Sequence, residues 1–390
     1  MRAEFPGDQD RLHFITDTPA HRVLMGIASL FPARVSSITF GYASHLLTQL
    51  LQRRLVCELV QRYRIDVVHE PIPVSPKQPS AMFDVGVPVV IGPMNGGMEY
   101  PPGFGHMEGT FSRASVNAAR EMAALLNRVI PGKRHAAALL VANERTRRAL
   151  PPGLDHVPVF EVVENGVDLA RFTVASAPTT TADPTVRFAF VGRLIDWKAL
   201  DVLLDAFTAA RAAVPSITLD IFGDGLQREA LQAQAERLGL APYVRFHGFL
   251  PQEEVAAALH SMHVLVLPSL YECGGAVVLE AMAMGLPVIS TRWGGPADYL
   301  DPSCGVLIEL SDRPTLSQDL TRALVDLASH PERRRAMGEA GRAKVVEQYD
   351  WERKVDRVLS IYSDAIANHC ADRKPAGVTA APNQRTETTR

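Results

Sequence analysis

Short apolar segments of strand length alternate with longer segments of helical periodicity throughout the second half of the chain. The first apolar segment is Arg187–Leu194, and the leucines of the following segment 199–214 recur at the three- and four-residue spacing of a helix face. Further strand-length segments follow, separated by segments of helix length: Ile217–Phe222, Val244–His247, Val264–Leu267, Val288–Ser290 and Gly305–Ile308. Strands that alternate with helices predict a doubly wound parallel sheet, which binds ligands at the carboxyl ends of its strands.

A similar but weaker alternation runs through the first half. The apolar segments there are Leu12–Ile15, Val67–His69, Val87–Ile91, Leu139–Val141 and Val159–Val163. We therefore predict an α/β fold with two Rossmann-like, doubly wound parallel-sheet domains that face a cleft. The segment His45–Arg64 has leucines on one side and arginines elsewhere. This pattern favours a helix packed on the first sheet, but a basic amphipathic helix also suits a membrane surface, which leaves peripheral membrane association open.

Changes in composition divide the chain into five parts. Residues 173–185 are small, proline-containing and without apolar periodicity, as in a linker between a first domain at 1–172 and a second at 186–350. Spaced apolar residues predict a final helix at 351–371 that crosses back to the first domain. The polar, threonine-rich stretch 372–390 has no aromatic residue and is predicted to be disordered.

The overall composition limits the class of protein. With 390 residues, 47% of them apolar, the chain is long enough for two domains, and its net charge of −3 argues against a nucleic-acid partner. Apolar stretches such as Ala136–Ala142 are far shorter than the roughly 20 residues of a membrane span, and the N-terminus shows no signal peptide. We therefore expect a cytoplasmic protein, with the inner face of the membrane as an alternative place. The four cysteines form no C-x-x-C pair, so we expect reduced thiols and no metal site.

A pair of glycines separates a predicted strand from a predicted helix. Gly274 and Gly275 follow the strand, and the segment after them, Ala276–Met284, is rich in helix formers. A helix N-terminus presents unpaired N–H groups and a partial positive charge, which suits a phosphate. Glu272 precedes this point and Glu280 follows it, so an elongated anionic ligand can touch both carboxylates. The alternatives are a plain tight turn for the glycines and a solvated helix position for Glu280.

Two cationic residues stand at the carboxyl end of the second domain's first strand. Arg193 and Lys198 are five residues apart, at the place where a doubly wound sheet binds its ligand. Two cations there can neutralise a diphosphate. Exposed arginine and lysine are more often solvated charges, and the spacing alone does not decide between the two interpretations.

The second half resembles the donor domain of glycosyltransferase family 4, the retaining GT-B enzymes also described as glycosyl transferases group 1. The resemblance rests on four blocks that occur in the expected order and span about half of the chain. They are Val163–Phe172, Val191–Leu194 with Trp197–Lys198, Phe222–Gly225 with His247–Gly248, and Pro268–Pro287. The segment Trp293–Asp298 is also similar to the one that follows in such proteins.

The resemblance implies a role for each matching residue. Glu272 would be the catalytic residue that contacts and orients the transferred sugar, and Glu280 would accept hydrogen bonds from the ribose diol. The donor diphosphate would be held by two side chains and three backbone amides: Arg193 and Lys198, with Gly274, Gly275 and Ala276. The implied reaction transfers a hexose, with retention of configuration, from a UDP- or GDP-sugar to a glycan or lipid-linked acceptor, as in polysaccharide biosynthesis. It would need no cofactor and no metal.

The beginning of the chain departs from this family. Residues 1–10 contain no strand that leads into a glycine-rich loop, so we expect the first, acceptor-side domain to be incomplete by roughly two strand–helix units of about 30 residues each. This expectation motivates a rival function, that of a nucleotide-sugar-binding remnant serving as a regulatory or scaffold subunit. An NAD-dependent oxidoreductase is disfavoured, because neither domain has G-x-G-x-x-G after a strand with an acidic residue about 20 positions further on.

Other positions allow two interpretations each. Gly96 and Gly97 follow a predicted strand where many relatives carry a histidine, and they either line the site or form a plain loop. Cys273 is either a reactive thiol of lowered pKa or a residue that fills the place of an aromatic side chain common in the family. Asn165 with the glycine after it is either a ligand contact or a turn.

Overall fold

The computed structural model describes most of the chain. The described residues are 7, 9–30, 33–71, 74–108, 122–174 and 185–372. Most of the predicted linker and nearly all of the predicted disordered tail lie outside them, so the structure does not test these two predictions.

The second domain contains a six-stranded, all-parallel sheet. Its strands are β5 (Val186–Val191), β6 (Ile217–Phe222), β7 (Val244–Gly248), β8 (Val264–Leu267), β9 (Val288–Thr291) and β10 (Gly305–Ile308). All six coincide with predicted segments, which confirms the doubly wound pattern. The spatial order is β10-β9-β8-β5-β6-β7, so the direction of strand addition reverses between the neighbours β5 and β8. A sheet of this kind binds its ligand outside the carboxyl ends of the strands at that reversal.

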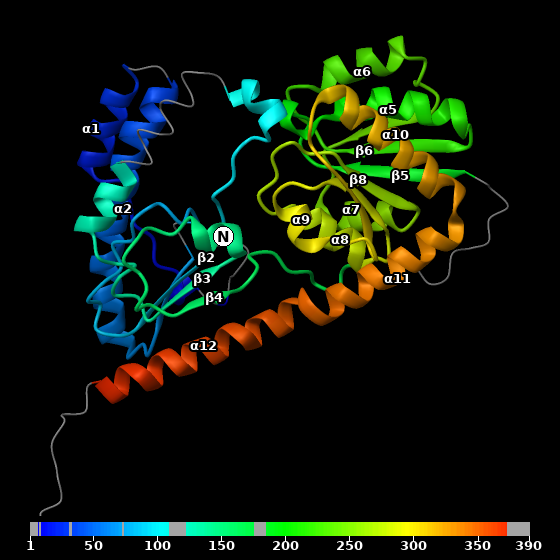
Figure 1. Cartoon of the computed structure of the whole chain (residues 1–390). Helices are drawn as coiled ribbons and strands as arrows, with labels where there is room; N and C mark the ends of the chain where they lie inside the picture. Colours follow the sequence, from blue (N-terminus) through cyan, green and yellow to red (C-terminus); the bar gives the residue numbers. More distant parts are fainter. Residues whose placement is uncertain are drawn as a thin grey trace, which may run out of the picture.

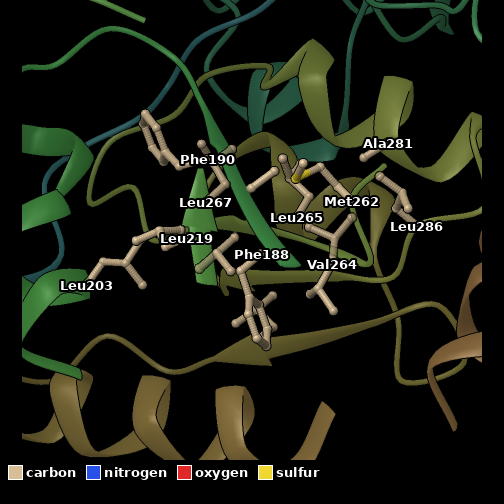
Figure 2. Packing of buried hydrophobic residues seen from close by; sticks show 14 of the residues in the cluster. Phe188, Phe190, Leu203, Leu219, Met262, Val264, Leu265, Leu267, Ala281 and Leu286 are labelled. Carbon is tan, nitrogen blue, oxygen red and sulfur yellow. The ribbon is translucent and has the colours of Figure 1, made fainter. Parts of the chain in front are cut away.

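Helices lie on both sides of this sheet (Figure 1). They are α5 (Leu200–Ala213), α6 (Arg228–Arg237), α7 (Gln252–Leu259), α8 (Ala276–Ala283), α9 (Gly295–Tyr299), α10 (Arg313–Ser329) and α11 (Pro331–Gln348). The core between the helices and the sheet is apolar. Figure 2 shows Phe188 of β5, Leu203 of α5 and Leu265 of β8 within it, and each of these side chains is inaccessible to solvent. Close packing of this apolar core fixes the strands, and with them the ends of the loops that follow the strands.

The first domain has a four-stranded parallel sheet in sequential order. Its strands are β1 (Val68–Glu70), β2 (Val89–Met94), β3 (Ala138–Val141) and β4 (Val159–Glu161). Four of the five predicted segments are therefore confirmed. The prediction for Leu12–Ile15 is wrong, because this segment forms no strand and connects the short 3-10 helix η1 (Gln9–Arg11) to α1 (Pro19–Ala28). Its Phe14 side chain is 49% exposed, so the run is not buried as a strand of this sheet would be.

The amphipathic segment at residues 45–64 lies, except for its last residue, within the long helix α2 (Ala33–Tyr63), which packs against α1. Val56 and Cys57 of α2 contact the apolar core under β2 and β3, as expected of a helix packed on a sheet. A short helix, α4 (Glu144–Arg148), follows β3, and the 3-10 helix η2 (Pro102–Glu108) follows β2. No helix in the described part of the chain is long and apolar enough to cross a membrane.

The last helix, α12 (Trp351–Asp372), leaves the second domain and runs along the first (Figure 1). Its Ile361 and Ala365 side chains are buried against Val90 of β2 and Leu140 of β3. One continuous helix thus ties the two domains together, which limits how far they can separate.

Candidate functional site

The loops that follow β5 and β8 meet at the reversal point of the second sheet. After β5 the chain forms the 3-10 helix η3 (Asp196–Lys198), and after β8 it forms the β8–α8 loop, residues 268–275. The backbone N–H of Leu270 donates a hydrogen bond of 2.8 Å to the carbonyl of Trp197 and so joins the two loops. A backbone hydrogen bond therefore joins the two loops directly at the reversal point.

Two of the predicted site residues contact each other at this junction. The Lys198 ammonium donates a hydrogen bond to the Glu272 carboxylate, and the Ser269 hydroxyl lies 3.3 Å from the same oxygen. The Lys198 and Glu272 side chains are only 13% and 15% exposed. By contrast, the Arg193 guanidinium is exposed and makes no hydrogen bond or ion pair with any residue that the structure describes. Within the described residues, the site thus holds one paired cation and one that has no partner.

Glycine is required at the start of α8 for steric reasons. Gly275 has φ +72°, in the left-handed region, and a Cβ atom there would lie 3.1 Å from Cγ of Glu272. A Cβ atom on Gly274 would overlap the Asn165 amide and the Glu164 carboxylate. The backbone N–H of Gly295 in α9 donates to the Glu272 carbonyl at 2.9 Å. Both glycines are therefore required by close packing against residues 164–165, Glu272 and α9.

This packing gives a first prediction. Gly275→Ala should lose about 1–2 kcal/mol of folding free energy from the left-handed backbone and should also lower turnover, because the new methyl group displaces Glu272. Gly239→Ala is the matched control, since Gly239 has φ +70° and a Cβ atom there would meet no other atom within 4 Å. Thermal unfolding should show similar losses for both variants, and only Gly275→Ala should lose activity. A normal turnover number in Gly275→Ala would show that Glu272 is not positioned by this glycine.

Glu280 accepts a hydrogen bond of 2.8 Å from the Gln252 amide, and Arg171 donates to the Gln252 oxygen at 2.7 Å. Sequence reasoning missed both partners, since they lie on other elements. Burial raises the pKa of the Glu280 carboxyl, and the Gln252 hydrogen bond and the Arg171 charge only partly oppose this effect. The Gln252 amide thus holds the Glu280 carboxylate, whose two oxygens can accept further hydrogen bonds.

A second prediction concerns Glu280 and pH. A raised pKa means that the folded chain holds this proton more tightly than the unfolded chain, so stability falls as pH rises above the ordinary value of 4.5. Glu280→Gln removes this loss, and its Tm should exceed that of the wild type by an amount that grows from pH 4 to pH 7. Glu332→Gln is the control, because it makes the same substitution at a side chain that is 83% exposed and paired with Arg335 on the surface, so its effect on Tm should be small. A pH-independent difference in Tm for Glu280→Gln would contradict this reasoning.

The structure shows the contacts of three other residues that allowed two interpretations. Gly96 exchanges hydrogen bonds with the Thr146 side chain of its own domain, so its contacts are those of a packed loop. Burial and the Glu272 charge raise the pKa of the Cys273 thiol, so the interpretation of Cys273 as a thiol of lowered pKa is wrong. The Asn165 amide donates to the Tyr299 hydroxyl at 3.1 Å, which is a structural contact between the chain's two halves.

The family comparison agrees with this geometry. Residues 175–344 match the model of the family "Glycosyl transferases group 1". The second domain of this chain is therefore similar to this family. This match confirms the family resemblance that was predicted for the second half. The likeness to solved structures given below confirms the predicted two-domain GT-B fold, while the roles of individual residues stay predictions.

The curated relatives that the chain matches include glycosyltransferases. D-inositol 3-phosphate glycosyltransferase of Salinispora tropica is 34% identical over 253 residues, which cover 59% of this chain and 52% of the relative. A GDP-mannose-dependent monoacylated alpha-(1-6)-phosphatidylinositol monomannoside mannosyltransferase of Corynebacterium glutamicum is 32% identical, covering 57% of this chain and 61% of the relative. The chain thus spans about half the length of the curated relatives it matches.

Among solved structures, the sucrose-phosphate synthase of Thermosynechococcus elongatus superposes with a TM-score of 0.58 at 20% identity, covering 82% of this chain and 79% of that one. The Anabaena protein HepE in complex with UDP superposes with a TM-score of 0.57 at 19% identity, covering 82% of each chain. At these identities the likeness concerns the fold, and it extends over both domains.

Proposed function

We propose that the chain is a retaining glycosyltransferase that moves a hexose from a nucleoside-diphosphate sugar to a glycan or lipid-linked acceptor. The observation that carries the proposal is the contact of Lys198 with Glu272 at the carboxyl ends of β5 and β8, next to the start of α8. A cation, a carboxylate and a helix N-terminus at one point suit a ligand that has a diphosphate and a sugar joined together.

The reaction requires stabilisation of charge on the leaving group. The exposed Arg193 guanidinium, Lys198 and the backbone amides of Gly274, Gly275 and Ala276 would neutralise the diphosphate as its bond to the sugar breaks. The acceptor hydroxyl would attack the anomeric carbon from the face that the diphosphate vacates and pass its proton to a diphosphate oxygen. Glu272 would orient the sugar in this step. Retention follows, because the new bond forms on the same face as the old one.

The nucleoside would lie beside this site. Glu280, held by Gln252, would accept hydrogen bonds from the ribose diol. The base would lie near Gly223–Gly225 and His247–Leu250, where the His247 ring stacks on Phe222 with ring centroids 4.5 Å apart. The contacts there do not distinguish uracil from guanine, so the donor is a UDP- or GDP-sugar. We also propose a cytoplasmic location, at the inner face of the membrane if the acceptor is lipid-linked.

The test is a screen of UDP- and GDP-hexoses with the purified chain. Release of nucleoside diphosphate and transfer to simple glycosides would be followed together, and proton NMR of the product would give the configuration of the new bond. A product with the donor's configuration supports the proposal, and an inverted product contradicts retention. Binding of nucleotide sugar without any turnover would favour the rival function, a regulatory or scaffold subunit that binds the donor only.

A further inference from the structure

One side chain of the first domain holds the backbone of the β8–α8 loop. Asn95 follows β2 at the carboxyl edge of the first sheet and is 8% exposed. Its amide nitrogen donates to the Glu164 carboxylate and, at 3.0 Å, to the carbonyl of Cys273. Cys273 directly follows Glu272, so Asn95 is fixed to the middle of the loop that carries the proposed catalytic carboxylate.

The orientation of the Asn95 amide is determined by its surroundings. Glu164 can only accept hydrogen bonds when ionised, so it attracts the NH2 group of Asn95, and the second N–H then points to the Cys273 carbonyl. Glu164 is itself held, because the amide of Asn165 also donates to it at 3.3 Å. Lys354 of α12 donates to the Asn165 carbonyl. The hydrogen bond between Asn95 and Glu164 is therefore supported by contacts of Asn165 and of Lys354 in α12.

The Glu164 carboxyl is partly shielded from solvent, which affects its hydrogen bonding and its pKa. One of its carboxylate oxygens is inaccessible to solvent and accepts no hydrogen bond from the residues that the structure describes. Burial raises the pKa of this carboxyl, and the Asn95 hydrogen bond and the Lys354 charge oppose that change, while Asp298 reinforces it. Loss of the Asn95 amide would therefore remove one of the hydrogen bonds that offset the burial of Glu164.

We propose that Asn95 is a positioning residue that reaches across from the first domain and fixes the β8–α8 loop, and with it Glu272, in the geometry needed for sugar transfer. The expected effect of Asn95 on turnover rests on the proposed function. The domains keep other contacts without Asn95, such as the hydrogen bond of 2.8 Å from Asn143 to Asp298 and that of 2.9 Å from Trp293 to the Glu99 carbonyl. Loss of Asn95 should therefore loosen this loop without separating the domains.

The chain offers a matched control for Asn95. Asn127 is also 8% exposed, and its amide nitrogen also donates to two acceptors, the carbonyls of Lys77 and Ala123, at 2.7 Å each. Both of these acceptors lie within the first domain. Asn127→Ala thus removes the same chemistry from an equally buried place whose hydrogen bonds stay within one domain.

The experiment compares wild type, Asn95→Ala and Asn127→Ala by three measurements: hydrogen exchange of the amides of residues 271–277, affinity for UDP and GDP, and turnover of the nucleotide sugar found in the screen. In Asn95→Ala, exchange in this segment should be about tenfold faster and kcat about tenfold lower, as expected for one lost hydrogen bond. Nucleotide affinity should fall only about threefold, because Arg193 and Lys198 keep their proposed contacts with the diphosphate when the backbone amides of the loop loosen. Asn127→Ala should lower Tm and leave all three quantities as in the wild type.

Asn95→Asp is a second variant in case the alanine form does not fold. It keeps the size of the side chain but replaces the donor group by an acceptor that faces the Glu164 carboxylate and the Cys273 carbonyl, so the loop should exchange faster in this variant too. Unchanged exchange at residues 271–277 in either variant, or equal changes in Asn127→Ala, would overturn the inference. Absence of turnover in the wild type would overturn the proposed function instead, and hydrogen exchange would still decide on Asn95.

Discussion

In Glu272→Gln, turnover should fall about a hundredfold, in line with the loss of one preorganised transition-state contact, while affinity for UDP or GDP should rise. The rise follows from the contact between Glu272 and Lys198 in the ligand-free chain, since the carboxylate competes with the diphosphate for the same ammonium. Removing a partly buried ion pair of this kind should strengthen nucleotide binding about fivefold. Steady-state kinetics and calorimetric titration measure the two effects separately.

The control for Glu272→Gln is Asp301→Asn. The Asp301 carboxylate accepts a hydrogen bond of 2.7 Å from Lys344 in the same domain, away from β5 and β8. This variant should keep both turnover and nucleotide affinity. Equal losses of turnover and nucleotide affinity in Glu272→Gln would mean that the carboxylate contacts the nucleotide rather than the sugar.

Lys198→Ala should weaken the binding of UDP and GDP about thirtyfold, because a hydrogen bond from a charged donor to a phosphate is lost. Turnover should fall with it, since the same charge stabilises the leaving diphosphate. Tm should fall too, because the Glu272 carboxylate, 15% exposed, is left without its cation. Calorimetric titration with each nucleotide measures the affinity.

Lys344→Ala is the corresponding control for the lysine, as it breaks an ion pair of the same type. It should lower Tm without changing nucleotide affinity. If Lys198→Ala and Lys344→Ala bind UDP and GDP equally well, Lys198 does not contact the diphosphate, and the proposed site is wrong.

Sequence periodicity located the strands of the second domain because a strand buried on both faces has a continuous apolar run. Such runs located β5 and β8 and thereby the loops that carry Lys198 and Glu272. The edge strand β7 has exposed Arg245 and His247, and its place between segments of helix length indicated it instead. The run at Leu12–Ile15 failed, because four residues do not reveal whether a neighbouring strand exists to pair with them. An apolar run in the sequence thus predicts a strand correctly where the fold supplies a neighbouring strand for it to pair with.

The partners of the site residues could not be predicted in this way. Asn95 and Cys273 are 178 positions apart, and Gln252 and Glu280 are 28 apart on different helices. Hydrogen bonds of this kind depend on how helices and loops are placed by the whole fold, and they leave no periodic signal. The contact between Lys198 and Glu272 was likewise unforeseen, since each was expected to contact a different part of the ligand.

The most direct test of the central claim is calorimetric titration of the wild-type chain with UDP and with GDP, repeated with Lys198→Ala and Glu272→Gln. The account predicts saturable binding of at least one nucleotide, weaker binding in Lys198→Ala and tighter binding in Glu272→Gln. Absence of binding for both nucleotides in the wild type, or affinities that neither substitution changes, would contradict a nucleoside-diphosphate site at the ends of β5 and β8.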